Sequence, residues 1–269
     1  MSRIRETFAA LKHLGRGGFI PFITAGDPDL TTTELLLSEL AAVGADIIEL
    51  GVPFSDPVAD GEVIQRASER ALRNGVTLRD ALTCIARARQ NIDVPIVLFS
   101  YFNPLLKFGE DRLAEEAKRA GVDAVLVTDL TPEEAQTWTE KLIQRGLDPI
   151  FLVAPTTSDD RLAQIAKQAR GFIYAVSRAG VTGARDQLTS DAAALVKRVR
   201  AVTDLPVAVG FGVSTAEQVR EVWRFADAAV VGSAIVSQIE KLADASDLIS
   251  RVGEFARSLL GSKQAHFTP

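Results

Sequence analysis

The sequence predicts an α/β fold: a closed (β/α)8 barrel of the TIM type, with an extra N-terminal helix and an enlarged second βα loop. Eight short runs rich in Val and Ile alternate with amphipathic stretches. Most of these runs are apolar throughout, as strands of a parallel sheet covered on both faces are. Their starts are mostly 22 to 35 residues apart, one βα unit each. A doubly wound open sheet is the alternative, but no Gly-x-Gly-x-x-Gly pattern follows the first run.

The expected strands are residues 19–23, 46–50, 95–99, 124–128, 149–153, 171–176, 206–209 and 228–231. The starts of the second and third strands lie 49 residues apart, and the interval holds a long loop, Pro53–Gly61, and a helix from about Leu78 to Gln90. Extended loops in barrels more often serve function than packing. Residues 1–269 are expected to form one domain.

The expected helices begin before the first strand. Four apolar residues there have helical spacing: Ile4, Phe8, Leu11 and Leu14. Gly15 ends this stripe, which is expected to plug the bottom of the barrel. Further along, Ser158 or Asp159 is expected to open one helix and Ser214 another, while Pro132 suits the first turn of a third.

Composition excludes several classes of protein. The formal net charge is -5 and no basic block is present, which disfavours nucleic-acid binding. No apolar run approaches the roughly 18 residues of a membrane helix, and no signal-peptide core follows the first residues. The single Cys84 cannot form an internal disulfide. A cytoplasmic location is therefore expected.

Scarce residue types restrict the chemistry. The chain has only two histidines, His13 and His266, and neither lies at an expected strand end. The eight lysines fall on expected helices, outer loops or the tail: residues 12, 107, 118, 141, 167, 197, 241 and 263. A metal site and imine chemistry are therefore disfavoured. Proton transfer by carboxylates remains, which indicates a lyase or an isomerase.

Carboxylates at strand ends are the candidate acids and bases. Glu49 interrupts an apolar strand, and burying its carboxylate is costly unless the group is paired or takes part in proton transfer. The alternative is a Glu bonded to a backbone amide or an Arg. Asp60, on the following loop, is either a second catalytic carboxylate or a turn former beside Gly61. For Asp27 and Asp129, a structural role is at least as well supported.

Glycines after the last three strands indicate a phosphate site. They lie in residues 180–183, 210–212 and 232–233. Small residues expose backbone N–H groups to an anion, and barrels often bind phosphate at this position. The alternative is that these glycines only allow tight turns.

Five aromatic residues are expected at the mouth of the barrel: Phe22, Phe99, Tyr101, Tyr174 and Phe211. They either belong to the hydrophobic core or form a slot for a flat ring.

Several longer segments match the pattern of a known family. They are Pro21–Pro28, Glu49–Pro57, Ala59–Gly61, Tyr101–Pro104, Phe151–Pro155, Gly180–Ala184, Val209–Gly212 and Val231–Ala234. Through them the chain resembles the tryptophan synthase alpha subunit family along nearly its whole length. The resemblance implies metal-free and cofactor-free cleavage of indole-3-glycerol phosphate to indole and glyceraldehyde 3-phosphate. It also implies that indole passes to a beta subunit that carries pyridoxal phosphate, in an alpha2-beta2 assembly.

The resemblance also implies roles for residues of this chain. Glu49 matches the family's general acid and base, and Asp60 matches the carboxylate that receives the indole N1 hydrogen. The implied substrate contacts are Phe22, Tyr101, Tyr174, Thr182, Gly183, Phe211, Gly212, Gly232 and Ser233. The implied partner contacts are Asp56, Pro57, Asn103 and Pro104. The loop that carries Thr182 is expected to close over the site.

Four residues depart from the family pattern: Val58, Glu62, Thr128 and Thr131. None removes a catalytic group, but Glu62 stands where Pro is common, and a loop without that Pro is less stiff.

Three other functions stay open at this point. One is a stand-alone lyase that releases indole, another is a non-catalytic activator subunit, and the most distant is a phosphosugar isomerase.

Overall fold

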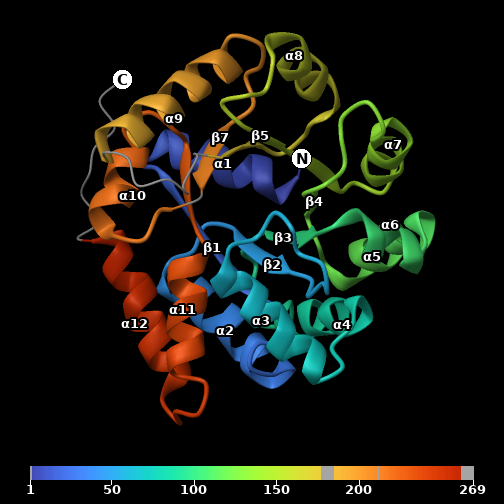
Figure 1. Ribbon diagram of the computed structural model, residues 1–269, viewed down its shortest axis with the longest axis vertical. Helices are drawn as coiled ribbons and strands as arrows, with labels where there is room; N and C mark the ends of the chain where they lie inside the picture. Colours follow the sequence, from blue (N-terminus) through green and yellow to red (C-terminus); the bar gives the residue numbers. More distant parts are fainter. Residues whose placement is uncertain (1, 177–184, 211, 262–269) are drawn as a thin grey trace.

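The computed structural model is a closed barrel of eight parallel strands that follow one another in chain order (Figure 1). It describes residues 2–176, 185–210 and 212–261. The strands are β1 (Gly18–Thr24), β2 (Ile48–Gly51), β3 (Ile96–Ser100), β4 (Ala124–Val127), β5 (Asp148–Val153), β6 (Ile173–Val176), β7 (Val207–Gly210) and β8 (Ala228–Val231). β1 pairs with β8 and closes the barrel. The predicted fold class and all eight strands are confirmed, with bounds that shift by no more than two residues.

Helices surround the barrel. They are α1 (Arg3–His13), α2 (Leu30–Val43), α3 (Glu62–Arg73), α4 (Leu78–Ala88), α5 (Phe102–Phe108), α6 (Glu110–Ala120), α7 (Gln136–Gln144), α8 (Asp159–Gln168), α9 (Arg185–Arg200), α10 (Ala216–Val222), α11 (Ser233–Lys241) and α12 (Leu248–Leu260). The predicted loop before α3 and the predicted helix α4 are both present. Within the described residues, no helix is long and apolar enough to cross a membrane.

Alternation along the strands divides the core into two layers. On β1, Ile20 and Phe22 belong to the cluster inside the barrel, whereas Phe19 and Ile23 pack against the surrounding helices. Ile4 of α1 also joins the inner cluster, and the ring of Phe8 lies 5.8 Å from that of Phe172, just before β6. Helix α1 therefore closes the amino-terminal end of the barrel, as predicted.

Leu14 does not share that burial. Its side chain is 63% exposed, although the apolar stripe predicted it to be part of the plug. Leu14 is the C-cap of α1, and the chain then turns through Gly15 at a φ of 61°. The turn carries the side chain of Leu14 away from the face that packs on the barrel.

The helix starts differ from the predicted ones more than the strands do. Ser158 caps α8 as predicted, with its Oγ accepting from the backbone N–H of Arg161. Thr215, not Ser214, caps α10, because a capping box with Gln218 fixes the register. Pro132 opens a separate turn, and α7 begins only at Gln136. Helix α11 is followed by α12, which packs against α2.

Candidate active site

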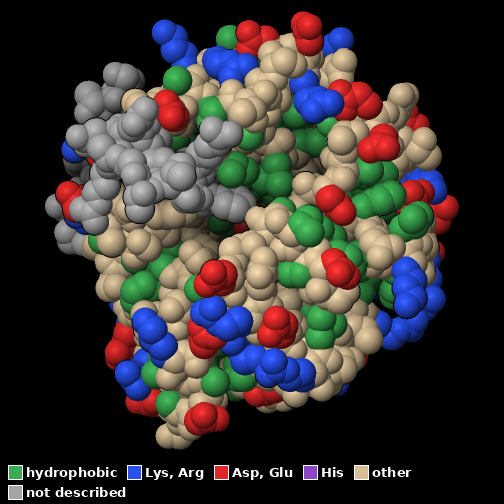
Figure 2. Space-filling model, in the orientation of Figure 1, with side chains coloured by type: hydrophobic (Ala, Val, Ile, Leu, Met, Phe, Trp, Pro, Cys, Tyr) green, Lys and Arg blue, Asp and Glu red, His purple; other side chains and the backbone are tan. Residues whose placement is uncertain are grey.

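The residues singled out at strand ends gather at the carboxyl-terminal mouth of the barrel. Phe22 on β1 lies opposite Glu49 on β2, and Glu49 lies opposite Val97 on β3. Phe22 and Val97 belong to the cluster inside the barrel. Figure 2 shows hydrophobic side chains beside a hollow near the middle of the drawn face.

Glu49 is a buried carboxyl group without a partner. It is 1% exposed, and in the described part of the chain neither carboxylate oxygen has a hydrogen-bond partner. The alternative of a tether to a backbone amide or an Arg is therefore not observed. Burial raises the pKa of Glu49 from 4.5 to about 8. The group can hold a proton at neutral pH and can also release it, as a general acid and base must.

Thr24 is a polar residue of the mouth that the sequence did not single out. It lies two residues beyond Phe22 on β1 and pairs with Gly51, so it shares the inner face with Phe22. It is 2% exposed, and its Oγ1 has no partner among the described residues. A polar side chain at the end of an apolar strand was the signal that identified Glu49, and the same signal applied to Thr24.

Asp60 is held at the mouth by Tyr101. The hydroxyl of Tyr101 donates to Asp60 Oδ2 at 3.1 Å and accepts from the backbone N–H of Ala59 at 2.9 Å. The ring of Tyr101 lies 5.1 Å from that of Phe54, so the aromatic pair anchors the loop at both ends. Burial raises the pKa of Asp60 from 3.8 to about 6, against the lowering effect of the Tyr101 hydrogen bond.

The other strand-end acids have structural partners. Both oxygens of Asp27 accept from Arg70, at 2.7 and 2.9 Å. Asp129 accepts from the backbone N–H of Phe102, the first residue of α5. These contacts support the structural roles that were weighed for Asp27 and Asp129.

Aromatic rings form one wall of the mouth. The rings of Phe22 and Phe99 meet edge to face, 5.2 Å apart. Tyr174 is 4% exposed, and its pKa is raised above its usual value by burial and then by the charges of Glu49 and Asp60. The pKa of Tyr174 is therefore sensitive to the charge on Glu49 and on Asp60.

Two strand-end glycines make room for these rings. A Cβ on Gly51 would lie 2.5 Å from Cζ of Phe22, and one on Gly210 would lie 2.2 Å from the hydroxyl oxygen of Tyr174. No side chain fits at either position without displacing an aromatic residue. This packing reason accounts for Gly210 without invoking phosphate.

The expected phosphate site is described only in part. Thr182, Gly183 and Phe211 lie outside the described residues. Gly212 has a φ of 83°, which favours glycine, and Gly232 caps α11, whose first residue is Ser233. A Cβ on Gly232 would meet nothing closer than 3.6 Å. Packing therefore does not require glycine there, whereas the approach of a ligand to the helix N-terminus would favour it.

The expected partner contacts lie on neighbouring segments. Asp56 and Pro57 belong to the loop between β2 and α3, and Asn103 and Pro104 belong to α5. Both segments carry exposed apolar side chains. Val58 is 86% exposed on the loop, and Leu106 is 53% exposed on α5.

The remaining departures from the family pattern have local contacts. Glu62 begins α3, where a negative charge suits the helix dipole, and it lies 4.0 Å from Arg66. The backbone N–H of Thr128 donates to Ser100. Thr131 Oγ1 donates to Glu134 at 2.9 Å, within the turn that precedes α7.

No group of metal-ligating side chains occurs in residues 2–176, 185–210 and 212–261. His13 lies on α1, as predicted, and all seven described lysines lie on helices, whereas the sequence left helices, outer loops and the tail open for them.

The fold and the site thus define a class: a (β/α)8-barrel enzyme with carboxyl groups of raised pKa and an aromatic wall at its mouth. Comparison with known proteins identifies the family. The model of the tryptophan synthase alpha chain family matches residues 8–262. The chain therefore belongs to this family, whose members are lyases of tryptophan biosynthesis.

Relatives match over almost the whole chain. The tryptophan synthase alpha chain of Citrifermentans bemidjiense is 52% identical over 96% of this chain and 97% of its own length. That of Geobacter sulfurreducens is 50% identical over 96% and 98%. Among solved structures, tryptophan synthase subunit alpha of Legionella pneumophila is 36% identical with a TM-score of 0.89, covering 96% of this chain and 97% of that one. A chain of M. tuberculosis tryptophan synthase, in an aminoacrylate-bound form, is 36% identical with a TM-score of 0.85, covering 96% and 100%.

Proposed function

We propose that Glu49 and Asp60 carry out the alpha-chain reaction, the retro-aldol cleavage of indole-3-glycerol phosphate to indole and glyceraldehyde 3-phosphate. The observation that carries the proposal is the buried, unpartnered carboxyl group of Glu49, with a pKa of about 8. A burial this costly is compatible with stability only when the group stays neutral in the free protein. A neutral carboxyl group is the proton donor that the first step requires.

The proton movements balance with two carboxyl groups. Glu49 gives its proton to indole C3, and the ring becomes a cationic indolenine. Asp60, ionised, accepts a hydrogen bond from N1–H and stabilises that charge. Glu49 then takes the proton of the adjacent glycerol hydroxyl. The carbon–carbon bond breaks, its electron pair returns to the indole ring, and the hydroxyl carbon becomes the aldehyde of glyceraldehyde 3-phosphate.

The two ends of the substrate are assigned to different parts of the mouth. We place the indole ring against Phe22, Tyr101 and Tyr174, whose burial leaves a largely apolar surround. The phosphate is assigned to Gly183, Phe211, Gly212, Gly232 and Ser233. Support comes from the start of α11 at Ser233, because a helix N-terminus carries free N–H groups and partial positive charge.

A beta subunit is the proposed partner, and pyridoxal phosphate is assigned to that subunit alone. The support is the pair of exposed apolar side chains, Val58 and Leu106, beside the expected contacts Asp56, Pro57, Asn103 and Pro104. A reducing, cytoplasmic location is proposed as well, because the one cysteine, Cys84, is buried and free.

Indole release tests the proposal directly. Purified protein is mixed with indole-3-glycerol phosphate, alone and with a beta subunit, and free indole or its product is followed. Release that increases with the beta subunit is expected. Fast release without the partner would favour the stand-alone lyase, and no release in either mixture would contradict the proposed reaction.

A further inference from the structure

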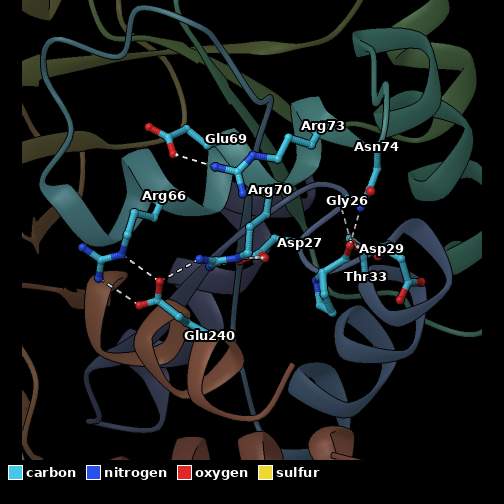
Figure 3. Close-up of polar contacts among 11 residues, drawn as sticks. Gly26, Asp27, Asp29, Thr33, Arg66, Glu69, Arg70, Arg73, Asn74 and Glu240 are labelled. Carbon is cyan, nitrogen blue, oxygen red and sulfur yellow. Dashed lines mark hydrogen bonds and ion pairs between the residues drawn. The ribbon is translucent and has the colours of Figure 1, made fainter. Parts of the chain in front are cut away.

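A chain of charged side chains joins three segments that lead into the mouth (Figure 3). Asp27 lies in the loop after β1, Arg70 on α3 and Glu240 on α11. Arg70 donates through Nε and Nη2 to the two oxygens of Asp27, at 2.7 and 2.9 Å, and through Nη1 to Glu240 at 2.7 Å. One guanidinium group therefore holds two carboxylates from different parts of the chain.

Burial decreases along this chain from its inner end to its outer end. The side chain of Asp27 is 1% exposed and that of Arg70 is 22% exposed. Glu240 is 26% exposed, and it also binds Arg66, which is 46% exposed. A buried carboxylate depends on its partner, whereas an exposed ion pair contributes little. The Asp27–Arg70–Glu240 chain is therefore the rigid part, and Arg66 is an exposed addition to it.

Other contacts fasten the same loop to α3. Asn74, at the C-terminal end of α3, donates through its side-chain amide to the carbonyl of Pro28 at 2.8 Å. The N–H of Gly26, in the same loop, donates to the hydroxyl of Thr33 on α2 at 2.9 Å. Figure 3 shows these contacts on the far side of Arg70 from Glu240. The loop after β1 and helix α3 thus form one unit, to which Glu240 attaches α11.

Each of the three segments continues into the proposed site. β1 carries Phe22, α3 begins two residues after Asp60, and α11 begins at Ser233. Because an α-helix rises about 1.5 Å per residue, Arg70 lies roughly 12 Å from the start of α3 and Glu240 roughly 10 Å from the start of α11. The ion pair therefore joins the two helices about two turns from the ends that face the substrate.

We infer that Asp27, Arg70 and Glu240 are positioning residues that set the spacing between the Asp60 loop and the N-terminus of α11. A substrate whose phosphate is anchored at α11 then presents its indole ring to Asp60 at the correct distance. The inference rests on the proposed function, and it assigns to these three residues a role in spacing rather than in contact. A misplacement of about 1 Å at a reacting centre can reduce the rate on the order of 100-fold.

Fragments of the substrate separate spacing from general damage. Indole and glycerol 3-phosphate each occupy one half of the site and do not depend on the distance between the halves. The variant Arg70→Lys keeps the charge but loses the planar fork that binds two carboxylates. We expect its kcat/KM for indole-3-glycerol phosphate to fall at least tenfold, while the dissociation constants of both fragments stay within about twofold of the wild-type values.

Two further variants make the result decisive. Arg66→Gln is the matched control, because Arg66 binds the same Glu240 from an exposed position, and its kcat/KM should stay within about twofold. Asp27→Asn keeps the size of the inner residue and replaces Arg70→Lys if that variant does not fold; the same loss of kcat/KM with unchanged fragment binding is expected. Full activity in a folded Arg70→Lys or Asp27→Asn protein would overturn the inference, and so would weakened binding of the fragments in step with activity.

A direct binding measurement distinguishes failure of the proposed function from failure of the spacing role. If the wild-type protein with its beta subunit released no indole, the intact substrate could be titrated directly by calorimetry. The spacing role then requires that the dissociation constant of intact indole-3-glycerol phosphate rise at least tenfold in Arg70→Lys, with both fragments unaffected. An unchanged constant would overturn the inference separately.

Discussion

The two ends of the barrel differ in how their polar side chains are partnered. At the amino-terminal end, aspartates that precede the strands are fully paired: Asp46 binds Arg16 through both oxygens and also accepts from the backbone of Phe19. Asp123 binds Arg3 and Arg89 and accepts from the backbone of Ile96. At the carboxyl-terminal end Asp27 is paired as well, but Glu49 and Thr24, which are 1% and 2% exposed, have no partner among the described residues.

Burial alone therefore does not identify a catalytic carboxylate. Asp27 and Glu49 are each 1% exposed, and burial raises the pKa of both. Only Asp27 has a guanidinium partner, which opposes that shift and keeps the residue in a structural role. The absence of a partner is what leaves Glu49 able to exchange a proton with a ligand.

The largest effect is expected from Glu49→Gln, which removes the proton donor and changes little else. Proton transfer by a positioned side chain contributes about 10²- to 10⁴-fold, so kcat should fall by that factor. Thermal stability at pH 7 should hardly change, because the wild-type carboxyl group is mostly neutral there. Steady-state kinetics and a melting curve check both statements, and a fully active variant would contradict the assignment.

The opposite behaviour is expected at the amino-terminal end. Asp123→Ala leaves Arg89, whose side chain is 11% exposed, without its carboxylate. Removing one partner of a buried pair costs about 3 to 5 kcal/mol, so the denaturation midpoint should fall sharply. The kcat of the folded fraction should stay within about twofold of the wild-type value. A stable variant with lost activity would reverse the distinction between the two ends.

A smaller effect is expected where the Asp60 loop meets Tyr101. Tyr101→Phe removes the hydroxyl that donates to Asp60 and accepts from Ala59. Leaving a polar group without its partner costs about 1 to 3 kcal/mol. If the placement of Asp60 loses that much, kcat/KM falls about 5- to 150-fold. Tyr174→Phe, which removes the other tyrosine hydroxyl of the barrel mouth and retains its ring, provides the comparison. A Tyr101→Phe protein with wild-type kcat/KM would show that this contact does not place Asp60.

The pH dependence of stability should also distinguish Glu49. In the unfolded chain this group loses its proton near pH 4.5, whereas in the folded protein it does so near pH 8. The folded state therefore binds more protons between these values, and this group lowers the free energy of unfolding as pH rises through the window. The slope should be smaller in Glu49→Gln, measured by denaturant titration from pH 5 to 8. Identical slopes in the two proteins would contradict an elevated pKa.

Much of the fold was predictable because most strands are short runs of apolar residues in which Val and Ile are frequent. Glu49 stood out for the same reason, as a charge within such a run. Thr24 did not, because threonine is common in strands and only the structure shows that its hydroxyl lacks a partner. The helix starts at Ser214 and Thr215 were indistinguishable by residue type, since Gln218 decides between them only through its side-chain contact.

Ion pairs between residues far apart in the chain could not be predicted from the sequence. Asp27 and Arg70 lie 43 positions apart, and Arg70 and Glu240 lie 170 positions apart. No local pattern links them, because their contact depends on how α3 and α11 pack around the closed barrel. The exposure of Leu14 depends likewise on the turn at Gly15, which interrupts an otherwise regular apolar stripe.

The pKa of Glu49, measured together with the rate, shows most directly whether this carboxyl group is the proton donor. Difference infrared spectra of wild type and Glu49→Gln report the protonated carboxyl group across a pH titration, and kcat/KM is recorded over the same range. Glu49 is expected to titrate near pH 8, and kcat/KM is expected to fall above that value. A second fall is expected below about pH 6 as Asp60 is protonated. A Glu49 carboxyl group already ionised at pH 6 in an active enzyme would contradict its role as the proton donor.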